Sequence, residues 1–183
     1  MRLSLSVRVA ESFRDKRVAT MELEELAALA SECGYHAVCL RASQVGVDSS
    51  KERIRACAGI LDQHQLTASM ATGDFAIPEN SEEGPAALQN ITPYLDLAEA
   101  LGCELLRVAM KTADDLDHAG RAADEAEERG VRLAHQCHTQ SLFETVDETL
   151  EVLRSIGRQN FGLIYEPANL ELCGQEVAGP TIE

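Results

Sequence analysis

The sequence contains no tryptophan, and aromatic residues make up only 4% of its 183 residues. It also has no CxxC pair, because its six cysteines stand apart from one another, at Cys33, Cys39, Cys57, Cys103, Cys137 and Cys173. This spacing argues against a structural zinc site and favours reduced thiols that pack as small apolar groups. No apolar run approaches the roughly 20 residues that a membrane-spanning helix needs. The first residues also lack the apolar core of a signal peptide, so we expect a cytoplasmic protein with no membrane partner.

Basic residues are few: 16 lysines and arginines stand against 31 aspartates and glutamates, for a formal net charge of −15. Proteins that bind nucleic acids need clustered positive charge to displace counterions from phosphates. We therefore expect no nucleic-acid partner, although one local basic pocket for a small anion is compatible with this composition. With 45% hydrophobic residues the chain can build one core, and we expect residues 1–183 to form a single domain.

Short apolar runs alternate with amphipathic stretches along the whole chain. The runs predict six strands, at Leu3–Val9, Ala37–Arg41, Thr67–Ala71, Glu104–Met110, Val131–His138 and Phe161–Tyr165. They begin roughly every 30 residues, the length of a βα unit. Five helices are expected between them, and two begin with the pattern of a capping box, at Ser49–Glu52 and Thr145–Glu148.

Alternating strands and helices predict a parallel sheet with helical crossovers. A doubly wound open sheet should have a glycine-rich phosphate turn after its first strand, and VRVAESFRDK has none. A complete (β/α)₈ barrel typically needs about 250 residues. We therefore predict an α/β fold of the TIM-barrel type that is incomplete, with six parallel strands and five helices. Its first and last strands would be unpaired, so we also expect a homo-oligomer.

Polar side chains stand at the predicted carboxyl ends of the strands, where barrel enzymes place their chemistry. They are Arg8, Arg41, Asp74, Arg107, Lys111, His138, Glu144, Glu166 and Asn169. This mixture of cationic, acidic and imidazole groups suits a metal ion together with a polyhydroxylated or anionic small molecule. The alternative is that strand ends are polar simply because they are exposed.

The stretch LAHQCHTQSLFET is the densest group of such residues. Successive side chains of a strand point to opposite faces. Gln136 and His138 should therefore face the barrel interior, whereas His135 and Cys137 should pack against the outer helices.

Two carboxylates, Glu144 and Glu166, follow the predicted fifth and sixth strands. Neighbouring strands lie about 5 Å apart, so carboxylates at their ends can share one ion. Oxygen ligands with one imidazole favour Mn²⁺, Mg²⁺ or Co²⁺ over Zn²⁺. Glu144 also precedes a predicted helix, and the alternative is that it only complements the helix dipole.

The segment HQCHTQSLFETVDETLEVLRSIGRQNFGLIYEPANLELCGQ resembles the fifth and sixth βα units of the xylose isomerase-like barrels. That superfamily comprises sugar and sugar-phosphate isomerases and epimerases, inosose dehydratases and endonuclease-IV-like proteins. The resemblance follows the element order of the whole chain, and its specific part is residues 131–175. It implies a divalent metal held by one acidic residue in or after the fifth strand and another at the end of the sixth.

The second of these ligands falls on Glu166, where the family more often has aspartate. The first is open between two positions. In the branch like inosose dehydratase a glutamate follows six residues after a histidine, as Glu144 follows His138. In another branch the ligand falls on Gln136, which has no carboxylate, so we favour Glu144. The family's remaining ligands, from strands seven and eight, have no counterpart in this sequence.

The resemblance implies a metal-dependent sugar or sugar-phosphate isomerase or epimerase that moves a proton α to a carbonyl of a carbohydrate substrate. Glu144 would be the base, and His138 would orient or protonate a substrate oxygen. The residues expected to bind substrate are Arg41, Arg107, Gln136 and Asn169. The alternatives are a catalytically incomplete barrel that self-associates and an endonuclease-IV-like hydrolase, which the acidic composition disfavours.

Overall fold

Six parallel strands form one sheet in the computed structural model, which describes residues 2–177 and 179. They pair in sequence order, each strand with the next. Their bounds are β1 Ser4–Ser6, β2 Ala37–Leu40, β3 Thr67–Ala71, β4 Leu105–Val108, β5 Arg132–Gln136 and β6 Phe161–Ile164. A doubly wound sheet would reverse its strand order at a switch point, and this sheet does not. The predicted incomplete barrel of six parallel strands is therefore confirmed.

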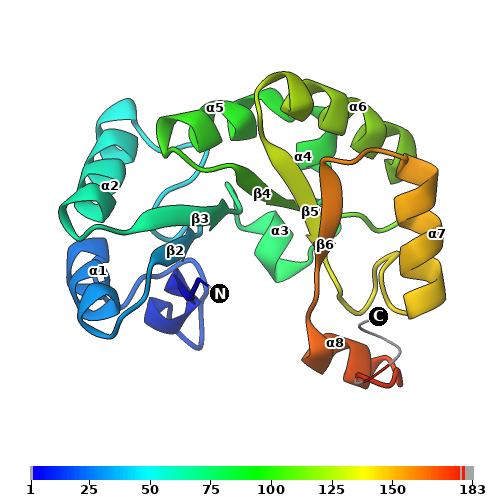
Figure 1. The fold of residues 1–183 in the computed structure, drawn as a ribbon, viewed down its shortest axis with the longest axis horizontal. Helices are drawn as coiled ribbons and strands as arrows, with labels where there is room; N and C mark the ends of the chain where they lie inside the picture. Colours follow the sequence, from blue (N-terminus) through cyan, green and yellow to red (C-terminus); the bar gives the residue numbers. More distant parts are fainter. Residues whose placement is uncertain (1, 178, 180–183) are drawn as a thin grey trace.

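Five longer helices follow the sheet along one side (Figure 1). They are α1 Leu23–Glu32, α2 Lys51–Gln63, α5 Thr92–Ala100, α6 Asp115–Glu128 and α7 Val146–Ile156, and they correspond to the five predicted helices. The described residues also form α3 Ala76–Glu79, α4 Ala86–Gln89, α8 Pro167–Leu172 and a 3-10 turn, η1, at Val7–Ala10. The predicted number of five helices was therefore too low. These short elements escape sequence analysis because four to six residues do not display a helical period.

Hydroxyl side chains determine where two of the helices begin. The Thr145 hydroxyl accepts a hydrogen bond from the Glu148 N–H at 3.2 Å, so the predicted start of this helix is confirmed. The Glu148 carboxylate accepts from the Thr145 hydroxyl at 2.7 Å, whereas in a full capping box it would accept from the Thr145 backbone N–H. At α2 the capping residue is Ser50, which accepts from the Arg53 N–H at 3.2 Å. The prediction that began at Ser49 was wrong by one residue, because the Ser49 hydroxyl accepts from the Gly46 N–H instead.

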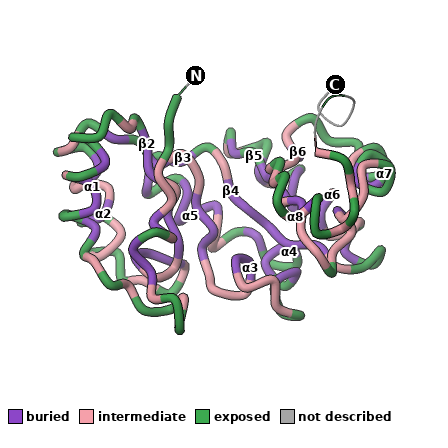
Figure 2. The backbone as a smooth tube through the Cα atoms, turned by 90° about the horizontal axis from the view of Figure 1, so that it is seen from below, coloured by how far each residue is buried: buried purple, intermediate pink, exposed green. Residues whose placement is uncertain are grey.

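The hydrophobic core lies between the sheet and the longer helices. Val38, Leu40, Leu106 and Leu133 point from the strands into this layer and are at most 1% exposed. The fully buried apolar residues that α6 adds to this core are alanines, at positions 119, 122, 123 and 126, and Leu116 packs against them partly buried. In Figure 2 the buried backbone follows the strands and the helix faces turned toward them. Since the core occupies one face of the sheet, the other face remains for polar side chains.

The first strand ends earlier than predicted. Leu3–Val9 was expected to be extended, but the chain turns into η1 after Ser6, whose hydroxyl accepts a hydrogen bond from the Arg8 N–H at 3.2 Å. This turn places Arg8 and Val9 at the inner face of the sheet. Among the described residues, no helix combines the length and apolar character that crossing a membrane requires.

Candidate functional site

A cavity of about 730 Å³ lies on the inner face of the sheet. Pockets of about 300–1,000 Å³ commonly hold small molecules. Each strand contributes to its wall through a residue at its carboxyl end or within two residues after it, namely Ser6, Arg41, Thr72, Arg107, Gln136 and Glu166. The carboxyl ends of barrel strands are where enzymes of this architecture bind substrates. The four residues that the sequence selects for substrate binding all line this cavity: Arg41, Arg107, Gln136 and Asn169.

Gln136 and Glu166 meet at the ends of β5 and β6. The Gln136 Nε2 donates a hydrogen bond to the Glu166 Oε2 at 3.3 Å. The register pairs Gln136 with Ile164, and Glu166 is two residues further on, so all three share the inner face. The other oxygen of Glu166, Oε1, has no hydrogen-bond partner among the described residues. It is therefore available to a molecule in the cavity.

Asn169 joins the start of α8 to the end of β5. Its Nδ2 donates to the backbone carbonyl of Cys137 at 2.8 Å. The helix begins directly after Glu166 with Pro167, whose fixed φ suits the first helical turn. The loop that carries Glu166 is therefore anchored on both sides of the carboxylate.

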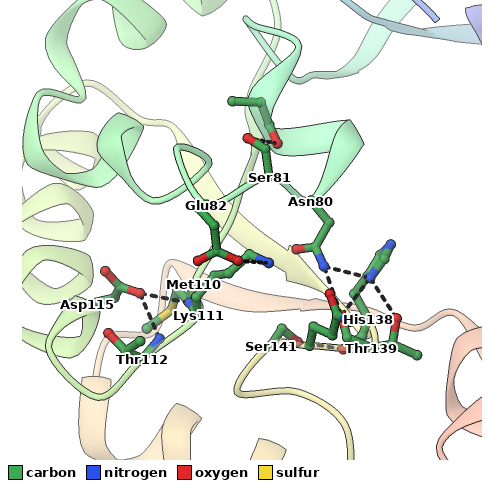
Figure 3. Close-up of polar contacts among 12 residues, drawn as sticks. Asn80, Ser81, Glu82, Met110, Lys111, Thr112, Asp115, His138, Thr139 and Ser141 are labelled. Atoms are coloured by element: carbon green, nitrogen blue, oxygen red, sulfur yellow. Dashed lines mark hydrogen bonds and ion pairs between the residues drawn. The ribbon is translucent and has the colours of Figure 1, made fainter. Parts of the chain in front are cut away.

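The His138 ring is held from one side by Asn80, which comes from the end of α3 (Figure 3). The Asn80 Nδ2 lies 3.0 Å from the His138 Nδ1 and donates to the Thr139 carbonyl at 2.8 Å. The same His138 Nδ1 lies 2.9 Å from that carbonyl. The ring is thus oriented through Nδ1, while Nε2 has no partner among the described residues. His138 lines the cavity, so Nε2 is the nitrogen that can meet a ligand.

The loop after β4 is fixed by Asp115 at the start of α6. One carboxylate oxygen of Asp115 accepts hydrogen bonds from the Lys111 and Thr112 N–H groups, at 2.7 and 2.9 Å (Figure 3). The Lys111 ammonium lies 3.5 Å from the carboxylate of Glu82. Neither Lys111 nor Asp115 lines the cavity. This polar network therefore supports the loop and leaves the cavity wall to other residues.

Arg41 is held in place by a buried carboxylate, Glu11. The Arg41 Nε donates to Glu11 Oε1 at 2.8 Å, and the Ser43 hydroxyl donates to the same oxygen at 2.7 Å. The Arg8 Nε lies 3.8 Å from the other oxygen of Glu11. Glu11 is not part of the cavity wall, but its contacts fix the direction of an arginine that is.

His135 and Cys137 lie on the outer face of β5, as the alternation of side chains predicts. The His135 Nε2 is 3.1 Å from the Met110 carbonyl, and its ring stacks on Phe143 with centroids 4.3 Å apart. Burial lowers the pKa of His135 to about 4, so the ring is neutral at physiological pH. Cys137 is buried, and burial raises the pKa of its thiol. Both residues therefore pack in the structure, away from the cavity.

The structure does not bring Glu144 to the cavity wall. Its carboxylate accepts a short hydrogen bond from the Gln140 N–H, within the loop between β5 and α7. Among the described residues no group of three or more His, Cys, Asp or Glu side chains could hold a metal ion. The Gln136 amide also already donates to Glu166. The residues at this end of the cavity do not fit a complete divalent-metal site, and the metal shared by Glu144 and Glu166 stays a prediction.

Sequence patterns do not single out three residues that shape this site: Glu11, Thr72 and Asn80. The position of Thr72, directly after the apolar run of β3, is a signal that could have been used. Asp74, which the sequence does select, is instead engaged by the Ile77 N–H at 2.9 Å and the Tyr94 hydroxyl at 2.5 Å. Its side chain therefore holds the first turn of α3, and it does not line the cavity.

Comparison with known proteins shows which family has this architecture. Residues 27–179 match the family model described as xylose isomerase-like TIM barrel. No curated protein sequence matches the chain. The matched residues span β2 to β6 and most of the cavity wall.

Solved structures with the same fold include a probable dehydratase, an epimerase and a protein in complex with magnesium. A probable 3-DHS dehydratase from Bacillus anthracis is 15% identical with a TM-score of 0.74, over 97% of this chain and 67% of that chain. A D-allulose 3-epimerase from Methylomonas sp. is 16% identical with a TM-score of 0.69, over 94% of this chain and 65% of that chain. A xylose isomerase-like protein from Mycobacterium smegmatis, in complex with magnesium, is 13% identical with a TM-score of 0.72, over 92% and 65%. The chain thus spans about two thirds of each, and the likeness shows the fold.

Proposed function

The chain belongs to the xylose isomerase-like TIM barrel family, and on that premise we propose that it moves a proton next to a carbonyl of a small polyhydroxylated compound. The reaction class is that of a sugar or sugar-phosphate isomerase or epimerase. The position of the cavity at the strand ends supports this proposal. So does the presence of an epimerase and a dehydratase among the solved structures with this fold.

The observation that carries the proposal is the arrangement of Glu166. One of its oxygens is held by Gln136 at 3.3 Å, and the other faces the cavity without a partner among the described residues. A general base must be held within hydrogen-bonding reach of the proton that it removes. A carboxylate that is fixed through one oxygen and open through the other meets this requirement.

In the proposed reaction, the Glu166 Oε1 takes the proton from the carbon next to the carbonyl. The electron pair of the C–H bond becomes the C=C bond of an enediolate, and negative charge develops on the carbonyl oxygen. In the tautomer in which the His138 Nδ1 accepts from the Asn80 Nδ2, the ring proton is on Nε2, which donates to that oxygen and lowers the energy of the enediolate. Return of the proton to the former carbonyl carbon, with the hydroxyl proton passing from one oxygen of the enediolate to the other, gives isomerisation. Delivery of a proton from water to the opposite face of the first carbon, while Glu166 keeps the proton that it removed, gives epimerisation.

No step of this proposal passes through a metal ion. At this end of the cavity the described residues provide one carboxylate, one imidazole and two side-chain amide oxygens, from Glu166, His138, Gln136 and Asn169. Divalent ions of the Mn²⁺ or Mg²⁺ class take about six ligands, so with a single carboxylate here the rest would come from water, substrate or further residues. The metal-dependent form of the reaction is therefore a separate proposal that needs ligands in addition to the described residues.

The direct test is proton exchange with solvent. The purified chain would be incubated in D₂O with D-allulose and, separately, with D-fructose 6-phosphate, and loss of the proton signal next to the carbonyl would be followed by NMR. We expect exchange in the parent chain and a loss of about 100-fold or more in Glu166→Gln, since general-base catalysis contributes about 10²–10⁴-fold. Glu171→Gln, an exposed position on α8, is the matched control and should exchange at the parent rate.

Two results would contradict the proposal. Exchange that is unchanged in Glu166→Gln would remove this carboxylate from the reaction. Absence of exchange with both sugars, in a chain shown by circular dichroism to be folded, would mean that these described residues do not catalyse proton transfer on this substrate class.

A further inference from the structure

Two polar groups in the cavity wall are buried and have no hydrogen-bond partner among the described residues. They are the Nε of Arg107 and the hydroxyl of Thr72, on side chains that are 9% and 1% exposed as whole residues. No hydrogen bond or ion pair with a described residue engages the rest of the Arg107 guanidinium either. Buried polar groups in proteins are nearly always hydrogen-bonded, and each exception calls for an explanation. Both groups line the same cavity, which suggests that the missing partner is a ligand.

The strand register brings these two residues to one level, together with Arg41. Leu40 pairs with Ala71, and Ala71 pairs with Leu106. The residues that follow them are Arg41, Thr72 and Arg107, side by side at the ends of β2, β3 and β4. All three line the cavity. Two guanidinium groups and one hydroxyl are thus adjacent hydrogen-bond donors.

The two strands that follow β4 in the sheet leave space beside Arg107 at the same level. Arg107 pairs with Ala134, and Ala134 pairs with Gly162, so the inward positions of β5 and β6 carry a methyl group and a hydrogen. A Cβ atom added to Gly162 would have no heavy atom within 4 Å. A compact group can therefore reach Arg107 from the interior of the barrel.

Arg41 and Arg107 bring positive charge to this part of the cavity wall, although the protein as a whole is strongly acidic. Glu11 is paired with Arg41 at 2.8 Å, whereas no described carboxylate forms an ion pair with Arg107, and Glu166 acts on its charge only from a greater distance. Burial and the nearby charge of Arg41 lower the pKa of Arg107 to about 10, so it still carries its proton at pH 7. A buried cation without a directly paired carboxylate is costly, and an anion bound against it relieves that cost.

From the two unpartnered donors, their register and the space before them, we infer that Arg41, Thr72 and Arg107 form a subsite for an oxyanion substituent of the substrate. The group is a carboxylate or a phosphate, because planar guanidinium groups bind both through paired hydrogen bonds. The inference deepens the proposed function, since it places an anionic group of the substrate below the reacting carbon at Glu166. It can be tested without turnover, so its failure and the failure of the proposed reaction are distinguishable.

The test is a titration of the ¹⁵N-labelled chain with inorganic phosphate and, separately, with acetate. The arginine Nε–H resonances are followed by NMR, and the Arg107 signal is assigned from its loss in Arg107→Gln. We expect the Arg107 Nε–H signal to shift with saturation in at least one titration, and the relative affinities then tell phosphate from carboxylate. If it stays in place with both anions, or moves linearly without saturation like the exposed arginines, the inference is overturned.

Three variants separate binding from folding. Arg107→Gln and Thr72→Val should each weaken anion binding, the first by about tenfold or more because a charged hydrogen bond is lost. Thr72→Val should also melt at or above the parent temperature, since it removes an unpartnered buried hydroxyl without changing the side-chain shape. Gly162→Val should weaken binding by filling the space, with all charges kept.

The matched control is Arg55→Gln, which removes one positive charge from an exposed side chain. It should bind anions like the parent. Equal affinity in Thr72→Val, Gly162→Val and the parent would mean that the anion binds elsewhere, and the subsite would be rejected.

Discussion

The Gln136 side-chain amide donates a hydrogen bond to the Glu166 carboxylate at the ends of two adjacent strands, with 3.3 Å between Nε2 and Oε2. A neutral amide thus occupies a position where the family resemblance allows a second carboxylate. The pair holds Glu166 without adding negative charge, so the carboxylate needs no metal ion to offset a like-charged neighbour. Because Gln136 is neutral, we expect this pair of side chains not to bind a divalent metal ion.

The parent chain should not bind Mn²⁺ stoichiometrically through the described residues. They contain no group of three metal-ligating side chains, and the Glu144 carboxylate is engaged by Gln140. Calorimetric titration of the parent alongside Glu144→Gln and Glu166→Gln measures this. Stoichiometric binding that disappears in both variants would instead establish the shared metal that the sequence predicts.

Gln136→Glu should create a divalent-ion site. The change places two carboxylates within hydrogen-bonding distance at the cavity wall, and a shared cation offsets their repulsion. We expect Mn²⁺ affinity to rise about tenfold or more over the parent, measured by the same calorimetry. Gln159→Glu, which adds a carboxylate at an exposed position, is the control. Similar Mn²⁺ affinities in the two variants would show that added surface charge alone explains the gain.

Glu11→Gln should destabilise the fold strongly. Glu11 and Arg41 are both buried and joined at 2.8 Å, so the variant leaves the Arg41 charge without its carboxylate. Removing one partner of a buried ion pair costs about 3–5 kcal/mol, and urea unfolding measures the loss. Glu52→Gln breaks the exposed pair with Arg55 and should cost less than about 1 kcal/mol. Equal losses would mean that burial does not strengthen the Glu11–Arg41 pair.

The free energy of unfolding should decrease as the pH is lowered through the range in which His135 titrates. Its pKa is about 4 in the folded protein and about 6.5 when unfolded. Between these values the unfolded state binds one more proton, so the free energy of unfolding decreases as pH falls from about 6.5 toward about 4. Above the unfolded pKa the contribution is fully present.

The measurement is urea unfolding at several pH values in the parent and in His135→Gln. The variant should lack the part of the slope that belongs to this imidazole, whereas carboxylates affect both proteins alike. Parallel pH profiles would show that His135 does not titrate differently in the folded state.

Local patterns in the sequence account for much of the architecture. The apolar runs predict six strands, and the strand Thr67–Ala71 has the predicted bounds. Alternation alone predicts that Gln136 and His138 face inward while His135 packs outside, because successive strand side chains must point to opposite faces. These features are predictable since they depend on neighbours only a few residues away.

Contacts between distant segments account for what the sequence does not predict. The Asn80 side chain meets His138 across 58 residues, and Glu11 meets Arg41 across 30. Neither contact has a periodic signal, because each is made only when separate βα units close around the cavity. The direction of the Glu144 side chain also depends on the folded structure. Its carboxylate accepts a hydrogen bond from the Gln140 N–H, and the conformation of the loop determines this contact.

The sequence by itself determined the α/β class, the order of strands and helices, and which strand residues share a face, since hydrophobic burial acts on local periodicity. The tertiary structure alone decided which of those residues meet. It brings Gln136 to Glu166 and sets Arg41, Thr72 and Arg107 at one level. The physical reason is the register of the strands. The alignment of neighbouring strands comes from packing across the sheet, and the sequence of one strand does not specify how its neighbour aligns with it.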